Sequence, residues 1–270
     1  MNEFLFLLIA FVIYFLVMLS GFIAFFKPGT SWLKLSSYLA ILGLVFHSIS
    51  ILTRTVQSHQ APFTTMYESL NFFAWACVLA VIIFERKLKL EKTGPYLWLI
   101  IIALLALASS PALPKEVSPL VPALQSYWLW LHVSVTLIGE AFLAIAFVAS
   151  LLYLLSRNKK MTPAETEKRK EKLDLVAYRA VAVGFPLFTL GALVFGMIWA
   201  SKAWGRYWGW DPKEVWSLIT WLFYALYLHT RLVYGWKGKK SALIAVLGFI
   251  AALFTFFGVN YLLRGLHSYV

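Results

Sequence analysis

The chain has 270 residues, of which 61% are hydrophobic and 17% aromatic, and its mean hydropathy of +0.77 is too high for a soluble domain. The net charge of +12 would suggest nucleic acid as the partner of a soluble protein, but basic loops between membrane spans account for it, so no nucleic acid is expected. The single cysteine, Cys77, excludes a disulfide or a C-x-x-C redox pair within this chain.

Eight apolar segments each come close to the ~20 residues that a helix needs to cross a bilayer. They lie at about 4–26, 36–54, 69–84, 96–113, 127–155, 179–200, 214–234 and 242–263. The first does not resemble a cleavable signal peptide, because Asn2 and Glu3 precede it and no small-residue cleavage site follows. The sequence predicts an all-α polytopic membrane protein with about eight transmembrane helices, in which residues 1–270 form a single integral membrane domain.

The basic residues predict the orientation of these helices. Eighteen of the 24 Lys and Arg residues fall in the connections after the first, third, fifth and seventh segments, and six fall on the opposite side. The positive-inside rule places the richer side in the cytoplasm. Both termini and residues 200–216 are then extracytoplasmic, whereas residues 156–178 form a cytoplasmic charged loop that is helical in part.

The most unusual stretch is WGRYWGWDPKEVW, which contains four of the twelve tryptophans. Asp211, Pro212 and Glu214 have the spacing of a helix N-cap, a first-turn proline and a capping-box acid. An interfacial aromatic belt explains one or two of the tryptophans. Flat aromatic faces, glycines and charges together favour a large planar ligand, bound by Trp204, Trp208, Trp210, Asp211 and Trp216.

Two histidines flank this stretch on the same predicted face. His132 lies in the first turns of the fifth segment, and His267 follows the end of the eighth. Two neutral imidazoles on opposite sides of one iron are the ligands of a bis-histidine haem. Three basic residues on that face could meet the haem propionates: Lys202, Arg206 and Arg264.

Other polar residues lie within or beside the predicted spans. His229 is deep in the seventh segment, so it is either a ligand or hydrogen-bonded to a neighbouring helix. His47, in the second segment, allows the same two interpretations, and His59 is expected in a solvated loop. Glu140 is either protonated or paired with a basic residue.

Four sequence motifs carry a family resemblance. They are WGRYWGWDPKEVWSLITW at 204–221, VPALQSYWLWLHVS at 121–134, YESL at 67–70 and GVNYLLRGLHSY at 258–269. In this order they resemble the CcsA (ResC) family, the haem-handling subunits of the system II cytochrome c synthase, whose tryptophan run is called the WWD domain. Many family members have a histidine two positions before the proline at 62, where this chain has Gln60.

The resemblance implies haem b as the cofactor, with His132 and His267 as catalytic ligands of an extracytoplasmic haem. It also implies that His229 ligates a second haem within the membrane, whose other ligand comes from a CcsB (ResB)-type partner. The function implied is export or presentation of haem and its covalent attachment to the C-x-x-C-H segment of apocytochrome c. The membrane would be a bacterial plasma membrane or a thylakoid.

Two alternatives remain open. One is a haem transporter or chaperone that delivers haem to a separate ligase without attaching it. The other is a regulatory or assembly protein that binds no haem and uses its histidines in polar packing, an interpretation that the tryptophan run disfavours.

Overall fold

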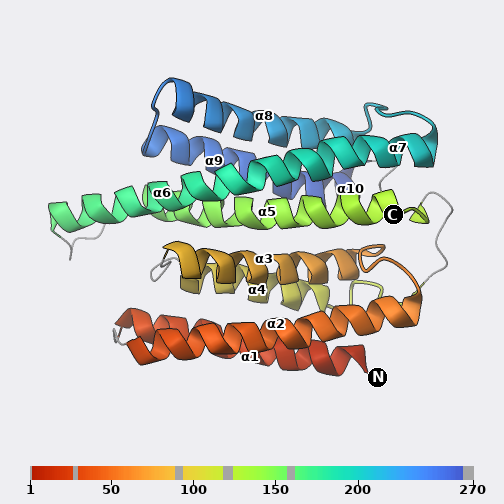
Figure 1. Cartoon of the computed structure of the whole chain (residues 1–270), viewed down its shortest axis with the longest axis horizontal. Coiled ribbons are helices and arrows are strands. Elements are labelled where there is room, and N and C mark those ends of the chain that lie inside the picture. The colour runs from red at the N-terminus through yellow and green to blue at the C-terminus, as the bar shows by residue number, and fades with distance from the viewer. Residues whose placement is uncertain (1, 27–29, 89–93, 118–123, 157–161, 264–270) are drawn as a thin grey trace. The chain divides into compact units, whose positions relative to one another are not determined.

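The computed structural model describes residues 2–26, 30–88, 94–117, 124–156 and 162–263, and within these ranges the regular structure is entirely helical. The chain divides into two compact units, Met1–Leu124 (unit 1) and Gln125–Val270 (unit 2), coloured red to yellow and green to blue in Figure 1.

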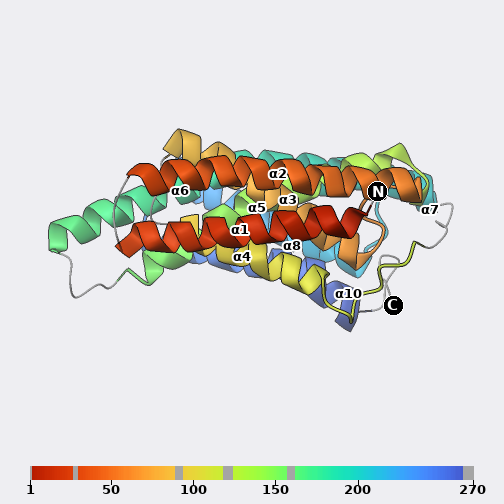
Figure 2. The ribbon, with the colours of Figure 1, turned by 90° about the horizontal axis from the view of Figure 1, so that it is seen from below.

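Unit 1 contains four helices, α1 (Glu3–Phe26), α2 (Thr30–Ser58), α3 (Met66–Leu88) and α4 (Gly94–Ala108). Successive helices run antiparallel, and α1 lies along α2 in both views (Figures 1 and 2). Glycines allow close packing, since a Cβ atom on Gly43 of α2 would lie 2.5 Å from the Tyr14 ring of α1. The end of α2, the start of α3 and the segment after α4 therefore meet near the start of α1.

Unit 2 contains four helical rods. They are α5 (Tyr127–Leu154); α6 (Pro163–Phe188) continuing through the π-helix η2 (Thr189–Phe195) into α7 (Gly196–Trp204); α8 (Pro212–Val233); and α9 (Lys239–Leu253) continuing through the π-helix η3 (Phe254–Gly258) into α10 (Val259–Leu262). The rods alternate in direction, so the start of α5, all of α7, the start of α8 and α10 lie at one end of unit 2 (Figure 1). This end is called the tryptophan end below.

The predicted membrane architecture is confirmed. Six helical rods among the described residues are long and apolar enough to cross a bilayer, and α4 is a shorter apolar helix. The remaining rod, α8, is also long enough, at 22 residues. The eight rods correspond one to one with the eight predicted segments. The extracytoplasmic orientation of the termini stays a prediction.

The largest difference from the predicted boundaries concerns the sixth segment. Its helix begins at Pro163 and not near residue 179, so the charged residues expected in a partly helical loop lie on an extension of the membrane helix. Thr162 and Glu165 form a reciprocal capping box, and Pro163 occupies the first turn. The rod Pro163–Trp204 has 42 residues, about 60 Å at the helical rise, which is longer than a bilayer is thick.

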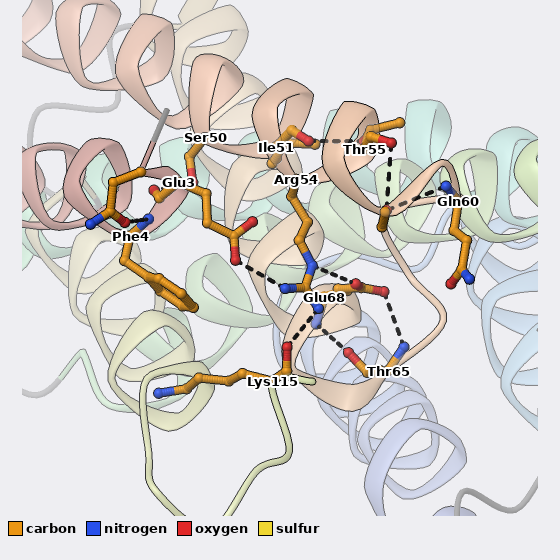
Figure 3. A network of polar contacts seen from close by, with 12 residues as sticks. Glu3, Phe4, Ser50, Ile51, Arg54, Thr55, Gln60, Thr65, Glu68 and Lys115 are labelled. Atoms are coloured by element: carbon orange, nitrogen blue, oxygen red, sulfur yellow. Dashed lines mark hydrogen bonds and ion pairs between the residues drawn. The ribbon is translucent and has the colours of Figure 1, made fainter. Parts of the chain in front are cut away.

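A buried ion-pair network joins the elements of unit 1 (Figure 3). The Arg54 guanidinium donates through Nε to Glu68 Oε1 at 2.8 Å, through Nη1 to Glu3 Oε1 at 3.0 Å and through Nη2 to the Lys115 carbonyl at 2.8 Å. It also lies over the Tyr67 ring, 5.6 Å from its centroid. One arginine of α2 thus connects α1, α3 and the segment after α4.

The YESL motif at 67–70 forms part of this network. Glu68 Oε2 accepts from the Thr64 backbone N–H at 2.9 Å and from the Thr64 hydroxyl at 2.7 Å, while Thr65 Oγ1 accepts from the Glu68 backbone at 3.2 Å. The Ser69 hydroxyl donates to the Phe63 carbonyl at 3.2 Å. The motif therefore starts α3 and fixes Arg54, which is a structural role.

Candidate functional site

His132 is held at the tryptophan end of unit 2 by two contacts. Its Nδ1 atom lies 2.9 Å from the carbonyl oxygen of Gly191 in η2. Its ring stacks on the Trp199 ring of α7, with centroids 5.6 Å apart and planes only 7° from parallel. Trp199 is buried and packs edge-on against Trp204 at 4.8 Å. An aromatic series thus connects His132 with the first tryptophan of the motif.

The hydrogen bond to Gly191 determines which nitrogen of His132 can bind a metal. A carbonyl oxygen only accepts, so Nδ1 carries the hydrogen and the lone pair lies on Nε2. Metal-ligating histidines commonly donate their other N–H to a backbone carbonyl in this way. The ring of His132 is therefore fixed in the tautomer that an axial haem ligand requires.

Two glycines let the η2–α7 rod approach His132. A Cβ atom on Gly191 would overlap the Thr136 backbone, and one on Gly196 would lie 3.0 Å from His132 Nδ1. The π-helix lies at this contact, as π-helical turns often do at functional sites. Its Thr189 hydroxyl accepts from the Trp221 indole N–H of α8 at 2.9 Å, so α8 also supports the segment that fixes His132.

The connection between α7 and α8 is shorter than the tryptophan-rich stretch suggested. Trp204 is the last residue of α7 and Trp216 lies on α8, which leaves residues 205–211 without helical structure. Gly205 ends α7 in the left-handed conformation, with φ of 73°. The Trp208 and Trp210 rings meet edge to face at 5.8 Å and 88°. Trp210 is 71% exposed, so its indole is available to a ligand.

The predicted start of α8 is confirmed. Asp211 is the N-cap and accepts from the Lys213 backbone N–H at 2.9 Å, and Glu214 completes a capping box with Pro212 in the first turn. Glu214 Oε2 also accepts from the Gly209 backbone N–H at 2.8 Å. The acid therefore orders the loop as well as the helix.

Other predicted haem-binding residues are Arg206, Trp216, Arg264 and His267, and the structure describes the first two. The exposed Arg206 side chain lies against Gly209, where a Cβ atom would come within 2.7 Å of its Nε. Trp216 packs on Phe254 of η3, with centroids 4.2 Å apart. Arg264 and His267 lie outside the described residues, which end one residue beyond α10 at Leu263.

His229 lies four residues before the end of α8, away from the tryptophan end, and its side chain is exposed on the surface of unit 2. Its ring meets the Tyr234 ring edge to face at 5.6 Å. Leu222, Leu226 and Val233, also exposed, have the spacing of one helical stripe with it. The imidazole thus lies on an apolar outer face and not in the core of unit 2.

The end of α8 beside His229 is fixed by a paired arginine. Arg231 donates from Nη1 and Nη2 to the two oxygens of Asp174 on α6, at 2.8 and 2.7 Å. The same carboxylate accepts from the Gly238 backbone N–H at 2.9 Å, and Arg231 lies over the Tyr178 ring at 4.6 Å. This bidentate pair joins α6, α8 and the turn before α9.

The structure decides between the two interpretations of His47. The side chain is fully buried in unit 1, with Nε2 2.7 Å from Asn71 Oδ1 and Nδ1 3.3 Å from the Tyr14 hydroxyl. The amide oxygen only accepts, so Nε2–H donates to Asn71 and Nδ1 accepts from Tyr14. Both nitrogens are engaged, which makes His47 a histidine of the polar core.

The structure also shows the surroundings of His59 and Glu140. His59 is exposed in the turn after α2, with φ of 53°, as expected for a solvated loop residue. Glu140 is buried on α5, and the basic group whose charge acts on it is Lys213 of α8. The basic neighbour of Glu140 was not evident from the sequence, because the two residues are 73 positions apart.

The sequence interpretation missed Trp199, Gly191 and Gly196, which orient His132. The signal available was modest: two glycines five positions apart in an apolar span, followed by a tryptophan. Close helix approach at small residues is common in membranes, but nothing in the sequence identifies the partner helix.

Comparisons with known proteins agree with the motifs. The family described as cytochrome C assembly protein matches residues 63–267. A relative named cytochrome c biogenesis protein CcsA from Chlamydomonas reinhardtii is 44% identical over 225 residues, covering 81% of this chain and 64% of the relative. The relative of the same name from Guillardia theta is 38% identical, over 85% of this chain and 83% of the relative. The one from Prochlorococcus marinus (strain MIT 9313) is also 38% identical, over 89% of this chain and 85% of the relative.

A solved structure has the same fold. The chain superposes on the protein named cytochrome c heme lyase CcmF with a TM-score of 0.65 and 17% identity, over 94% of this chain and 46% of that one. At this identity the likeness shows the fold alone. The sequence relatives and the family match show more, and by them the chain belongs to the CcsA family of cytochrome c biogenesis proteins.

Proposed function

We propose that this cytochrome c biogenesis protein presents haem b at the tryptophan end of unit 2, on the extracytoplasmic face. There it takes part in attaching haem to the C-x-x-C-H segment of apocytochrome c, as the subunit that works with a CcsB (ResB)-type partner. His132 and His267 would be the axial ligands, and the residues around Trp208, Trp210 and Arg206 would hold the porphyrin.

The observation that carries this proposal is the setting of His132. Its ring is fixed by the Gly191 carbonyl and by stacking on Trp199, which gives an imidazole with its lone pair on Nε2. An exposed indole, Trp210, belongs to the loop that follows the same aromatic series. A backbone carbonyl bonded to the other ring nitrogen is the partner that metal-ligating histidines commonly have.

The chemistry asks little of the protein beyond positioning. Each substrate thiol adds across a vinyl double bond of haem, so that sulfur bonds to one vinyl carbon and the thiol hydrogen goes to the other. No oxidant, leaving group or protein nucleophile is needed. Holding thiol and vinyl in the reactive orientation is the main contribution available to the chain, and such orientation alone lowers a barrier substantially.

His229 supports a second part of the proposal. An imidazole on an apolar face within a bilayer is unfavourable unless it has a partner, and this one faces outward from unit 2. We propose that it binds a haem within the membrane whose second ligand comes from the partner subunit. This arrangement also suits a transporter that only moves haem outward, so the decisive test concerns thioether formation.

The test uses His132→Ala and His267→Ala in the chain purified with its partner. Each variant should retain haem but lose most of the low-spin bis-histidine spectrum, and holocytochrome c should not form. Added imidazole should restore part of both, because the missing group is a ligand and not a proton donor. A histidine that only capped a helix or faced water would cost about 1 kcal/mol or less when replaced and would spare maturation.

The outcomes separate the candidates. Near-normal holocytochrome yield in both variants would refute the bis-histidine assignment. Haem transfer to another acceptor without any thioether product, in the wild-type complex supplied with reduced apocytochrome c, would instead favour the transporter. Thioether formation by the purified wild-type complex supports the synthase.

A further inference from the structure

Lys213 follows the tryptophan loop (residues 205–211) in the chain and reaches the last rod of unit 2. It is the second residue of α8, and its Nζ donates to Asn260 Oδ1 at 3.0 Å. The residue shares the first turn of α8 with Pro212 and Glu214, which order the loop. Any displacement of Lys213 would therefore move the loop relative to α10.

Asn260 is oriented to receive this bond. The side chain is 2% exposed, and its Nδ2 donates to the Phe256 carbonyl in η3 at 2.6 Å, which turns Oδ1 toward Lys213. α10 consists of only four residues, Val259–Leu262, and the chain reaches His267 seven positions after Asn260. The Lys213–Asn260 bond is thus a fixed point just before the segment that carries His267.

The charge of Lys213 also acts on Glu140 of α5, the helix that carries His132. Glu140 is 5% exposed on α5, and its charge and that of Lys213 act on each other. Glu140 follows His132 by eight residues, about 12 Å along the helix. Asp211, the N-cap of α8, also interacts with Lys213 through its charge. One lysine therefore bonds the start of α8 to α10, and its charge acts on a buried acid of α5.

We infer that Lys213 is a positioning residue that holds the end of the last rod against the start of α8, and so sets where the chain leaves α10 on its way to His267, one of the two proposed axial histidines. The inference rests on the proposed function for the role of His132 and His267. An ammonium can hold an acceptor on a neighbouring helix, and the apolar interior makes its loss costly because Asn260 would lose its hydrogen-bond partner and Glu140 a nearby opposite charge. An apolar residue at 213 would leave the helices free to shift.

The test compares Lys213→Met with Lys213→Arg in the complex purified with its partner, and Lys239→Met serves as the control. Lys239 is an exposed lysine at the start of α9, at the opposite end of unit 2. Lys213→Met should retain haem but lose the low-spin spectrum, with maturation reduced about tenfold or more, as expected for a small misplacement of reacting groups. Imidazole should restore the low-spin spectrum, and Lys213→Arg should retain much of it.

A second pair of variants covers the case in which Lys213→Met does not fold. Asn260→Asp keeps the acceptor for Lys213, whereas Asn260→Leu removes it, so only the leucine variant should lose the low-spin spectrum. Combining Lys213→Met with Asn260→Leu should add little to either change, because both remove the same bond.

The results distinguish this inference from the proposed function. A wild-type spectrum in Lys213→Met, or equal spectra for the two Asn260 variants, would overturn the positioning role alone. Loss of haem that imidazole does not correct would assign Lys213 to stability and also overturn it. A wild-type complex without haem at the tryptophan end would overturn the proposed function itself.

Discussion

His47 in unit 1 and His132 in unit 2 both lie on apolar helices, but their surroundings differ in one decisive respect. His47 is fully buried, and Asn71 and Tyr14 engage both of its nitrogens. His132 is partly exposed, with Nδ1 bonded to a backbone carbonyl and its ring flat against Trp199. The first arrangement stabilises a core, and the second prepares an imidazole to bind something outside it.

The comparison shows that a histidine within a membrane helix needs its hydrogen-bond partners identified before it is assigned a role. A side-chain amide oxygen that accepts from Nε2–H occupies the nitrogen that haem iron would bind. A backbone carbonyl that accepts from Nδ1–H instead leaves the lone pair on Nε2. His229 is a third case, exposed on an apolar face. The three histidines should therefore differ in how their replacement affects bound haem.

The largest effect is expected at His229. His229→Ala should remove one of two haems from the complex, because the side chain is the proposed ligand from this chain. Pyridine haemochrome analysis measures the stoichiometry, and added imidazole should restore the missing haem. His59→Ala, in an exposed turn, is the control. Equal haem content with and without the His229 side chain would return this residue to a packing role.

A smaller effect is expected at Gly191. Gly191→Ala forces a methyl group into the Thr136 backbone, so η2 must move and His132 loses its acceptor. Overpacking of this kind costs about 1–3 kcal/mol, and the low-spin fraction should fall while haem is retained. Gly21→Ala meets only the Pro95 side chain at 3.3 Å and should leave the spectrum unchanged. An unaltered spectrum in Gly191→Ala would show that the carbonyl does not orient the ligand.

The tryptophan loop should affect retention more than ligation. Replacing Trp208 and Trp210 together with Leu removes two aromatic contacts, each worth about 0.5–1.5 kcal/mol, and should weaken haem retention about tenfold. The iron should stay low-spin in the haem that remains. Trp236→Leu, in the turn before α9, is the matched control. Full retention in the double variant would favour the interfacial-belt interpretation of the loop.

The smallest effect on haem is expected at His47. His47→Leu should leave the haem count and spectrum unchanged but destabilise the protein by about 1–3 kcal/mol, since the Asn71 amide and Tyr14 hydroxyl lose a buried partner. Thermal unfolding measures the loss. Adding Asn71→Leu should recover part of it, because an apolar pair leaves fewer unsatisfied groups. Loss of haem in His47→Leu would reverse the comparison between the two histidines.

The sequence was sufficient for the architecture because each span and cap is encoded locally. Runs of apolar residues located the rods, and Asp211, Pro212 and Glu214 located the start of α8. The sixth predicted span began at about residue 179 because the apolar run starts there, whereas the helix itself begins at Pro163, after the capping signal at Thr162. Charged residues continue a helix beyond a membrane without any change in its hydrogen bonding.

The candidate site was predictable only in part. His132 and the tryptophans were proposed as site residues from residue type and spacing, since their chemistry is unusual for a membrane span. The contacts of His132 with Gly191 and Trp199 join residues 59 and 67 positions apart, and a single sequence contains no record of such pairings. The same limit hid the partners of Arg54 in unit 1.

The Arg54 network also bears on how the protein is made. Arg54 and Glu3 belong to α2 and α1, but Glu68, which binds the Nε edge of the guanidinium, belongs to α3, which leaves the ribosome after them. A charged side chain is unfavourable in a bilayer until it is paired. We expect the first hairpin to remain incompletely inserted until α3 emerges, so that nascent chains ending before α3 stay extractable with alkali whereas those extending past it do not.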